Sequence, residues 1–343
     1  MTTLESTSVT RERLYRMMRV YKETSLLRAA LRVGVFDALG DGHGTPAAIA
    51  TATGADPRGI RLLLNALVAL GLVHRHQDGR FTLDRGGFSL LVGSSPDFYG
   101  GMVDVVASDE EWDAMRDLAA AVRNGGSVRD VNAETPGYHY WETFARSVGP
   151  VTVPTAGLLA ELLEPWSATR SGTRVLDLAC GHGIYGFTLV RRLPGATVTC
   201  VDWPNVLEIT RQHAREQGLD SQARFVSGDM FELDLGPEHD LVLVTNVLHH
   251  FSEARATELL SRATAQLAPG GRIGVVGFVA GDDPARDPEP HLFSVLMLAW
   301  TNAGEVHTTA AHERMYAAAG LRIEATRRVP GLPFHVTVLG RSS

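Results

Sequence analysis

Apolar runs that alternate with helical patterns dominate the second half of the chain. A strand buried on both faces is almost continuously apolar, and such a run begins at Arg174 in R-V-L-D-L. Helical spacing follows from Phe187 to Val190. Further strands are predicted at 196–201, 223–227, 240–245, 272–279, 321–326 and 334–339. This alternation predicts an α/β fold with a seven-stranded, mostly parallel sheet.

The first hundred residues have a different pattern. Residues 13–35 are amphipathic at helical spacing. Their apolar positions are Leu14, Met17, Met18, Tyr21, Leu26, Leu27, Ala30 and Leu31. Segments 45–53 and 57–70 predict a helix-turn-helix, and 72–83 alternates around Asp78-Gly79, which favours a hairpin. We expect a winged helix, which either binds DNA or pairs two subunits. Few basic residues on its second helix favour pairing.

Two glycines follow the first predicted strand and precede a helix. Gly181 and Gly183 permit positive φ and let a ligand approach bare backbone beside a helix N-terminus. With Gly186 they form G-x-G-x-x-G, the dinucleotide fingerprint. They also fit motif I of class I S-adenosylmethionine (SAM) methyltransferases, D-x-G-x-G-x-G, with Ala179 at the first glycine. Asp177 favours SAM, because a carboxylate suits a sulfonium and an ammonium but repels a pyrophosphate.

Acidic or polar residues follow each of the next predicted strands. Asp202 ends the second strand about 20 residues past the glycine turn, where α/β nucleotide sites place a ribose ligand. G-D-M-F (228–231) follows the third strand, and N-V-L-H-H-F-S-E (246–253) follows the fourth. Because the carboxyl ends of parallel strands meet at one edge of the sheet, these residues predict a ligand crevice there.

Composition narrows the class of protein. The 343 residues are 44% hydrophobic and 21% charged, which is typical of a soluble globular protein of about two domains. A net charge of −7 gives no basic surface for nucleic acid or an anionic membrane. Lys22 is the only lysine, which argues against a Schiff base, and Cys180 and Cys200 are predicted to be buried thiols. The sequence shows no signal or membrane-spanning segment, so we expect a cytoplasmic protein.

Taken together, the motifs resemble those of the small-molecule O-methyltransferases. That family includes plant caffeate and hydroxyindole enzymes and bacterial tailoring enzymes of polyketide and antibiotic pathways. The shared segments are G-V-F-D-A-L (34–39), the glycine turn, V-D-W-P-N-V-L (201–207), G-D-M-F, L-H-H-F (248–251) and L-A-P-G-G (267–271). The resemblance implies a homodimer with a winged-helix dimerisation domain (1–100), a helical connector (101–165) that roofs the active site, and a Rossmann-like class I methyltransferase domain (166–343).

The resemblance also implies roles in binding SAM. Asp202 would hold the ribose hydroxyls, Trp203 would lie against the adenine, Asp229 would accept from its amine, and Met230 would pack on the ring. The backbone of 181–183 would approach the methionine part. The complete predicted cofactor set is Asp177, Ala179, Gly181, Gly183, Asp202, Trp203, Asp229, Met230, Phe231 and Thr245.

His249 matches the family's general base in L-H-D-W, where an imidazole takes a proton from a substrate hydroxyl. Two departures affect this residue. His250 stands where the family has aspartate. In the family's G-x-E-R-T stretch an acid orients the base, whereas here G-E-V-H-T places Val306 at the acid's position, with Glu305 one residue away and His307 in place of arginine.

Alternatives remain open at this point. His249 could be a structural histidine, or it could join His250, His291 and His307 in a metal site, although their spacing is no metal motif. We expect no metal. The predicted substrate contacts are Tyr140, His250, Phe293, Met297, Trp300 and Glu305. O-methylation of an aromatic secondary metabolite is the leading prediction. C-methylation of an activated ring carbon and a non-methylating or regulatory use of a SAM-binding fold are the alternatives.

Overall fold

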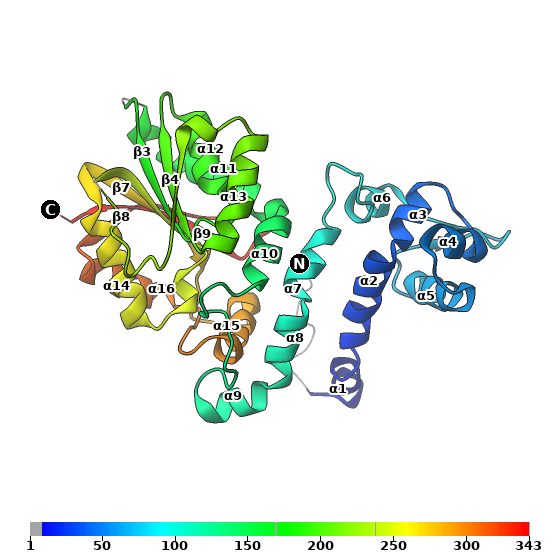
Figure 1. Cartoon of the computed structure of the whole chain (residues 1–343). Helices are drawn as coiled ribbons and strands as arrows, with labels where there is room; N and C mark the ends of the chain where they lie inside the picture. The colour runs from blue at the N-terminus through cyan, green and yellow to red at the C-terminus, as the bar shows by residue number, and fades with distance from the viewer. Residues whose placement is uncertain (1–8, 169, 237, 343) are drawn as a thin grey trace. The chain divides into compact units, whose positions relative to one another are not determined.

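The computed structural model describes residues 9–168, 170–236 and 238–342. The chain folds as two compact units, Met1–Ser108 and Asp109–Ser343, each with hydrophobic core clusters of its own (Figure 1). In the part of the chain that is described, no helix combines the length and the apolar character needed to cross a membrane.

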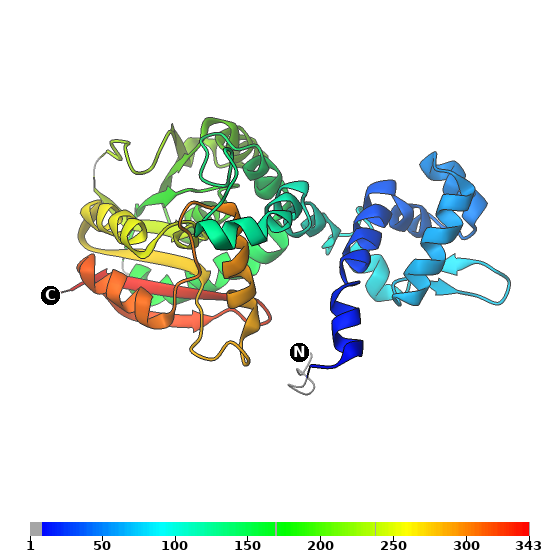
Figure 2. The same cartoon turned by 90° about the horizontal axis from the view of Figure 1, so that it is seen from below.

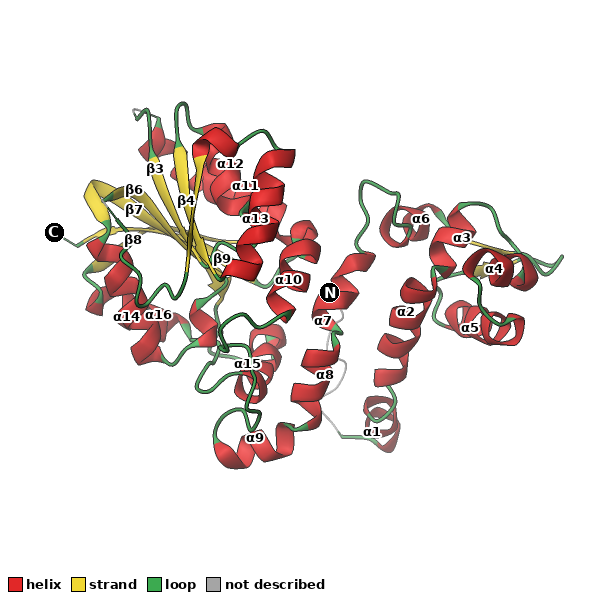
Figure 3. Ribbon diagram, in the orientation of Figure 1, coloured by secondary structure: helices red, strands yellow, loops and turns green. Residues whose placement is uncertain are grey.

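A seven-stranded sheet is the centre of the second unit (Figure 3). Its strands lie in the order β5-β4-β3-β6-β7-β9-β8. Their bounds are β3 Arg174–Leu178, β4 Thr197–Asp202, β5 Ala223–Ser227, β6 His239–Thr245, β7 Leu267–Phe278, β8 Leu321–Arg328 and β9 Phe334–Arg341. Strand β9 runs antiparallel to both of its neighbours, β7 and β8, whereas the other neighbouring strands of this sheet pair parallel. The predicted α/β fold with a mostly parallel sheet is therefore confirmed.

Helices cover both faces of this sheet. Successive strand residues point to opposite faces, so Val175 packs in one core cluster and Leu176 in the other. The first cluster includes residues of α11 (Gly149–Ser167), α12 (Ile184–Arg192) and α13 (Pro204–Glu216). The second includes residues of α14 (Glu253–Ala265) and α16 (Thr309–Ala318). The order reverses between β3 and β6, and in such sheets ligands bind at the carboxyl ends of the strands beside that point.

Shorter elements complete the second unit. They are α8 Asp109–Arg116, α9 Leu118–Asn124, α10 Tyr140–Ser147 and α15 Pro288–Trp300, with the 3-10 helices η2 Asp220–Gln222 and η3 Leu248–His250. Helix α8 and helix α9 both pack against α15. Thr308 caps α16, because its hydroxyl accepts from the Ala311 N–H.

The first unit is mainly helical. Its elements are α1 Arg11–Met17, α2 Tyr21–Val33, α3 Val35–Gly40, α4 Pro46–Thr53, α5 Pro57–Ala69, β1 His74–Arg75, β2 Phe81–Thr82, α6 Arg85–Leu91, η1 Gly100–Met102 and α7 Val103–Val106. Strands β1 and β2 form the predicted hairpin (Figure 2). Thr45 and Asp56 each cap the helix that follows, which explains the sharp starts of α4 and α5.

One predicted boundary is wrong by several residues. The strand that was predicted to begin at Arg272 begins at Leu267, because Leu267 already pairs with His239, so L-A-P-G-G belongs to β7. The amphipathic stretch at 13–35 is divided between two helices, of which α1 ends at Met17 and α2 begins at Tyr21.

Candidate active site

A glycine turn lies where the carboxyl ends of β3 and β4 meet. Gly181 has a φ of 54° and Gly183 a φ of 78°, so both use the left-handed region that suits glycine. A Cβ on Gly181 would meet only open space, which leaves its backbone accessible. Its N–H donates to Oδ2 of Asp202 at 2.8 Å. Ala179 also has a positive φ, 53°, at the place of the motif's first glycine.

Asp177 of β3 holds the start of α12, the helix that follows the glycine turn. It is fully buried in β3, and its Oδ2 accepts from the Gly186 N–H at 3.1 Å. A Cβ on Gly186 would lie 2.9 Å from the same oxygen, so the third glycine allows α12 to pack against β3. Burial raises the pKa of Asp177 to about 7, and its Oδ1 has no hydrogen-bond partner among the described residues. A cation bound at the turn would lower that pKa and stabilise the carboxylate.

Asp202 ends β4 with both carboxylate oxygens held by backbone N–H groups. Oδ2 accepts from Gly181, and Oδ1 accepts from Trp203 at 2.7 Å. Burial raises the pKa of Asp202 to about 6, against the lowering effect of these two hydrogen bonds. Each oxygen keeps a second lone pair. The indole of Trp203 is partly buried against a small cluster formed by Ala145, Val206 and Ile209.

The predicted residues after β5 and β6 also reach this edge of the sheet. Oδ1 of Asp229 accepts from the Phe231 N–H at 2.8 Å, which fixes the turn after β5. Phe231 is buried, with the guanidinium of Arg255 3.5 Å above the centre of its ring. Met230 packs partly buried in the same core cluster as Phe231, and Thr245 is buried at the end of β6.

This donor set fits SAM. The accessible Gly181 backbone suits close approach of the methionine part, and Asp202 offers acceptors for two ribose hydroxyls. The unpaired Oδ1 of Asp177 gives the site a second buried carboxylate, which favours a cationic ligand.

His249 and His250 lie on η3, past the end of β6. Asn246 has a φ of 53° and turns the chain out of the strand. The two imidazoles are buried with ring centres 4.6 Å apart. His249 makes edge-to-face contacts with Phe293 at 5.2 Å and Phe278 at 5.6 Å. Burial lowers the pKa of His250 to about 4 and holds that of His249 well below its usual value, so both are neutral near pH 7.

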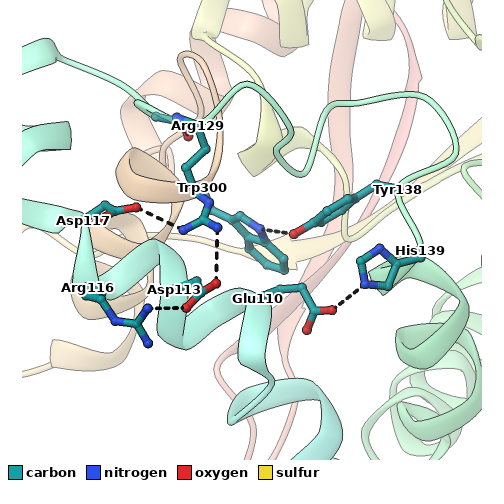
Figure 4. Close-up of polar contacts among 9 residues, drawn as sticks. Glu110, Asp113, Arg116, Asp117, Arg129, Tyr138, His139 and Trp300 are labelled. Atoms are coloured by element: carbon teal, nitrogen blue, oxygen red, sulfur yellow. Dashed lines mark hydrogen bonds and ion pairs between the residues drawn. The ribbon is translucent and has the colours of Figure 1, made fainter.

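An aromatic cluster continues from His250. The ring of Trp141 meets His250 edge-on at 5.1 Å, and it stacks against Trp300 at 5.9 Å. Tyr140 meets Trp300 at 4.6 Å, and the Trp300 indole N–H donates to the Tyr138 hydroxyl at 3.3 Å (Figure 4). These contacts join α10, α15 and η3 into one aromatic wall beside the two histidines.

Ion pairs fix the loop segment that precedes this wall. Arg129 binds Asp113 of α8 at 3.2 Å and Asp117 at 3.0 Å, and His139 lies 2.7 Å from Glu110 of α8 (Figure 4). The charged groups stay at the surface side of α8, while the rings of Tyr138 and Tyr140 pack inward.

Not every predicted substrate residue joins this cluster. Met297 is fully buried within α15, and Glu305 is exposed. In the G-E-V-H-T stretch the carboxyl therefore points outward, while Val306 and the His307 imidazole are buried. The stretch thus has a buried valine, Val306, at the acid's position and a buried imidazole, His307, at the position of the arginine.

Other residues beside His249 were not predicted from the sequence. Phe278, Trp141 and His312 contact the histidines or share a cavity with His249. Phe278 and Trp141 are ordinary core-type residues in the sequence. The sequence could have indicated His312, because it lies five residues after His307 on the helix that Thr308 caps.

No arrangement of three or more metal-ligating side chains occurs within the described ranges. His291 instead bonds to the Gly281 carbonyl at 3.1 Å, and His307 to that of Phe251 at 3.1 Å. Carbonyl contacts of this kind are typical of structural or positioning imidazoles.

Family models match both parts of the chain. Residues 158–322 match the O-methyltransferase domain, and residues 15–91 match the O-methyltransferase dimerisation domain. The chain belongs to the O-methyltransferase family. This O-methyltransferase is an enzyme that uses SAM, and the resemblance inferred from its motifs is confirmed.

Known relatives define its type more closely. Acetylserotonin O-methyltransferase of Mus musculus is 31% identical, with 94% of this chain and 86% of the mouse protein covered. The 3-hydroxy-5-methyl-1-naphthoate 3-O-methyltransferase of Streptomyces sahachiroi is 28% identical, with coverage of 81% and 80%. The solved structure of human N-acetylserotonin methyltransferase in complex with SAM shares the fold, with a TM-score of 0.81, 24% identity and coverage of 98% and 100%. The O-methyltransferase is thus of the hydroxyindole and natural-product type.

Proposed function

We propose that this O-methyltransferase methylates a hydroxyl group on an aromatic small molecule, with His249 as general base. The observation that carries the proposal is a buried, neutral imidazole placed between stacked aromatic rings and the carboxyl edge of the sheet. The relatives that act on acetylserotonin and on a hydroxynaphthoate support an aromatic substrate.

The chain's own residues would hold SAM at the sheet edge. Asp202 would accept from the ribose hydroxyls, Trp203 and Met230 would contact the adenine, and Asp229 would accept from its amine. The bare backbone at Gly181 would lie against the methionine part. When bound, SAM supplies a positively charged sulfonium whose methyl group is transferred and which leaves as a neutral thioether.

His249 would remove the substrate proton. The hydroxyl O–H bond breaks as the new O–C bond forms, and the proton moves to a ring nitrogen of His249. The site carries one positive charge before and after this step, first on the cofactor and then on the imidazolium. Proton uptake by His249 therefore adds no net charge to a buried site, which reduces the electrostatic cost of using an imidazole whose pKa is low.

The aromatic wall would select and position the substrate. Tyr140, Trp141 and Trp300 present ring faces and edges that suit a flat aromatic molecule. Phe293 touches both His249 and Phe278, so it would orient the substrate ring toward the base. Positioning of the hydroxyl against the methyl group would supply much of the acceleration.

The test uses methyl-labelled SAM with N-acetylserotonin and a hydroxynaphthoate as probe substrates. We expect His249→Ala to lower kcat by about 10²–10⁴-fold with little change in SAM affinity. His250→Ala should cost less, because it contacts the aromatic wall and is not the base. The melting temperature of each variant is measured in parallel. Normal turnover by a folded His249→Ala protein would remove the general base from the mechanism.

The same experiment separates the remaining alternatives. Label found on a ring carbon of the product would indicate C-methylation. SAM binding without label transfer to any hydroxyaromatic probe or cell extract would indicate a non-methylating role.

We also propose a homodimer. Helix α1 and the start of α2 expose Tyr15, Met17, Met18 and Tyr21, and the matched dimerisation domain covers this region. An exposed apolar surface of this kind suits a second copy of the chain better than nucleic acid.

A further inference from the structure

Four histidines line one small cavity behind η3. His249, His307, His312 and His335 come from four different segments of the second unit. Besides the histidines, two polar side chains line the cavity, those of Tyr316 and Thr337. The other lining residues are apolar and belong mainly to β7. No carboxylate lies among the lining residues. Three imidazoles thus line the same cavity as the proposed base, His249.

Backbone carbonyls fix the protonation pattern of two of these rings. The Nε2 atom of His307 lies 3.1 Å from the Phe251 carbonyl oxygen, and Nδ1 of His312 lies 3.0 Å from that of Thr308. A carbonyl only accepts, so each of these nitrogens carries a proton. In a neutral imidazole the other nitrogen is then an acceptor. In the neutral form of each ring, the nitrogen that can accept is Nδ1 of His307 or Nε2 of His312, and both rings line the cavity.

His249, the proposed base, needs an acceptor for its own ring N–H. Among the described residues, its ring contacts those of His250, Phe278 and Phe293. A general base needs its lone pair toward the substrate, so the proton of the neutral ring must sit on the other nitrogen. An acceptor behind the ring favours that tautomer, which is the role of the carboxylate in catalytic triads.

We propose that His307 and His312 are positioning residues, which accept the N–H of His249 through a water molecule in the cavity and so hold it in the base-competent tautomer. This inference rests on the proposed function. It explains how a site with Val306 at the acid's position, and with Glu305 turned outward, still orients its base.

The electrostatics of the cavity agree with this arrangement. Burial lowers the pKa of His312 to about 4, and nearby imidazoles lower that of His249 further, so these rings are neutral near pH 7. The hydroxyl of Tyr316 is buried beside Thr337, and burial raises the pKa of this tyrosine, so it remains protonated. His335 is only partly buried at the edge of the cavity.

The variants are chosen to keep each structural hydrogen bond and to remove the accepting ring nitrogen from its place in the cavity, since the amide oxygen is bonded to the same carbon as the donating NH₂. In His307→Gln the amide NH₂ can still donate to the Phe251 carbonyl, and in His312→Asn it can still donate to that of Thr308. His291→Gln is the matched control, because this ring also bonds to a carbonyl but does not line the cavity.

The readout is the ¹⁵N spectrum of histidine-labelled protein at pH 7, with the His249 signals assigned from His249→Ala. We expect one tautomer in the wild-type protein, a mixture in the His307→Gln/His312→Asn double variant, and no change in His291→Gln. With saturating SAM, kcat toward the hydroxyaromatic probes should fall at least tenfold in the double variant, while KM for SAM stays constant.

An unchanged tautomer and unchanged kcat in a folded double variant would overturn the inference, even if His249 is the base. If His249→Ala retains turnover, the proposed function fails, and the tautomer measurement still decides the role of the cavity. If kcat falls in the double variant but His249 keeps a single tautomer, positioning by these rings is ruled out as well.

Discussion

At the scale of single residues, the sheet edge depends most on Asp202. Its two oxygens are already held by backbone N–H groups, so the carboxylate is oriented before a ligand arrives. Orientation in advance reduces the entropy lost on binding. Burial without a cationic partner leaves its pKa raised, and this gives the free enzyme a pH-sensitive cofactor site.

SAM affinity should therefore rise with pH. In the proposed site an ionised Asp202 would accept from both ribose hydroxyls, and the pKa of Asp202 in the free protein is about 6. We expect SAM to bind about tenfold more weakly at pH 5 than at pH 7, as measured by calorimetry. Asp202→Asn should weaken binding at pH 7 by about 2 kcal/mol, the scale of hydrogen bonds to a charged group.

The same variant is the control for pH. Asp202→Asn should lose the part of the pH dependence of SAM binding that is centred near pH 6 and keep the part that is due to Asp177, whose pKa is about 7. At saturating SAM, kcat should change less than affinity between pH 7 and pH 5, because the pKa of His249 lies well below its usual value. Equal affinities at the two pH values in the wild-type protein would contradict the assignment of Asp202.

At the scale of elements, η3 is held in place by the chain after α15. The Gly304 N–H donates to the Thr301 hydroxyl at 2.7 Å. A Cβ on Gly304 would lie 2.6 Å from the His249 carbonyl and 2.7 Å from that of His250. This close backbone approach fixes η3 against α15, and only glycine permits it.

Gly304→Ala should therefore displace η3 and its two histidines. We expect a loss of kcat of tenfold or more and a lower melting temperature, because the methyl group would contact backbone that cannot move freely. SAM affinity should stay close to that of the wild-type protein. Gly281→Ala is the matched control, since a Cβ there meets nothing within 4 Å. Full turnover by Gly304→Ala would show that the position of η3 tolerates this shift.

At the scale of the whole molecule, the exposed apolar side chains of α1 and Met18 bear on the proposed homodimer. The described part of α1 buries none of its residues, and Met18 and Met17 are 71% and 62% exposed. Such side chains at the start of a matched dimerisation domain are expected to be covered by a second copy.

Sedimentation should give a dimer at micromolar concentration, with an interface above roughly 2,000 Å². The double variant Met17→Glu/Met18→Glu should dissociate it, because burial of two unpaired carboxylates is costly. Ile323→Glu, which changes an exposed apolar residue outside the matched dimerisation domain, is the comparison variant and should not dissociate the dimer. A monomeric wild-type protein would contradict the proposal, and a dimer that shifts a DNA duplex in a gel would favour a regulatory role instead.

The sequence by itself determined the local structure. All seven strands of the sheet were predicted to within a few residues at most ends. The central strands β3 and β6 gave the clearest apolar runs, because a strand buried on both faces must be apolar. The positions of the glycine turn, Asp202 and the G-D-M-F segment at strand ends followed from the same pattern. Prediction was poorest where two local signals compete. L-A-P-G-G has the residues of a helix stop, but pairing of Leu267 with His239 draws it into β7.

Only the tertiary structure decided what surrounds His249. Residues 278, 293, 307 and 335 lie 29 or more positions from His249 in the sequence, and no periodicity relates them to it. The strand order and the packing of α15 and α16 bring them together. Sequence spacing placed Glu305 next to the missing acid's position, yet the backbone direction turns that carboxyl outward and the His307 imidazole inward. Local propensity governs which element forms, whereas contacts between elements determine which side chains share a site.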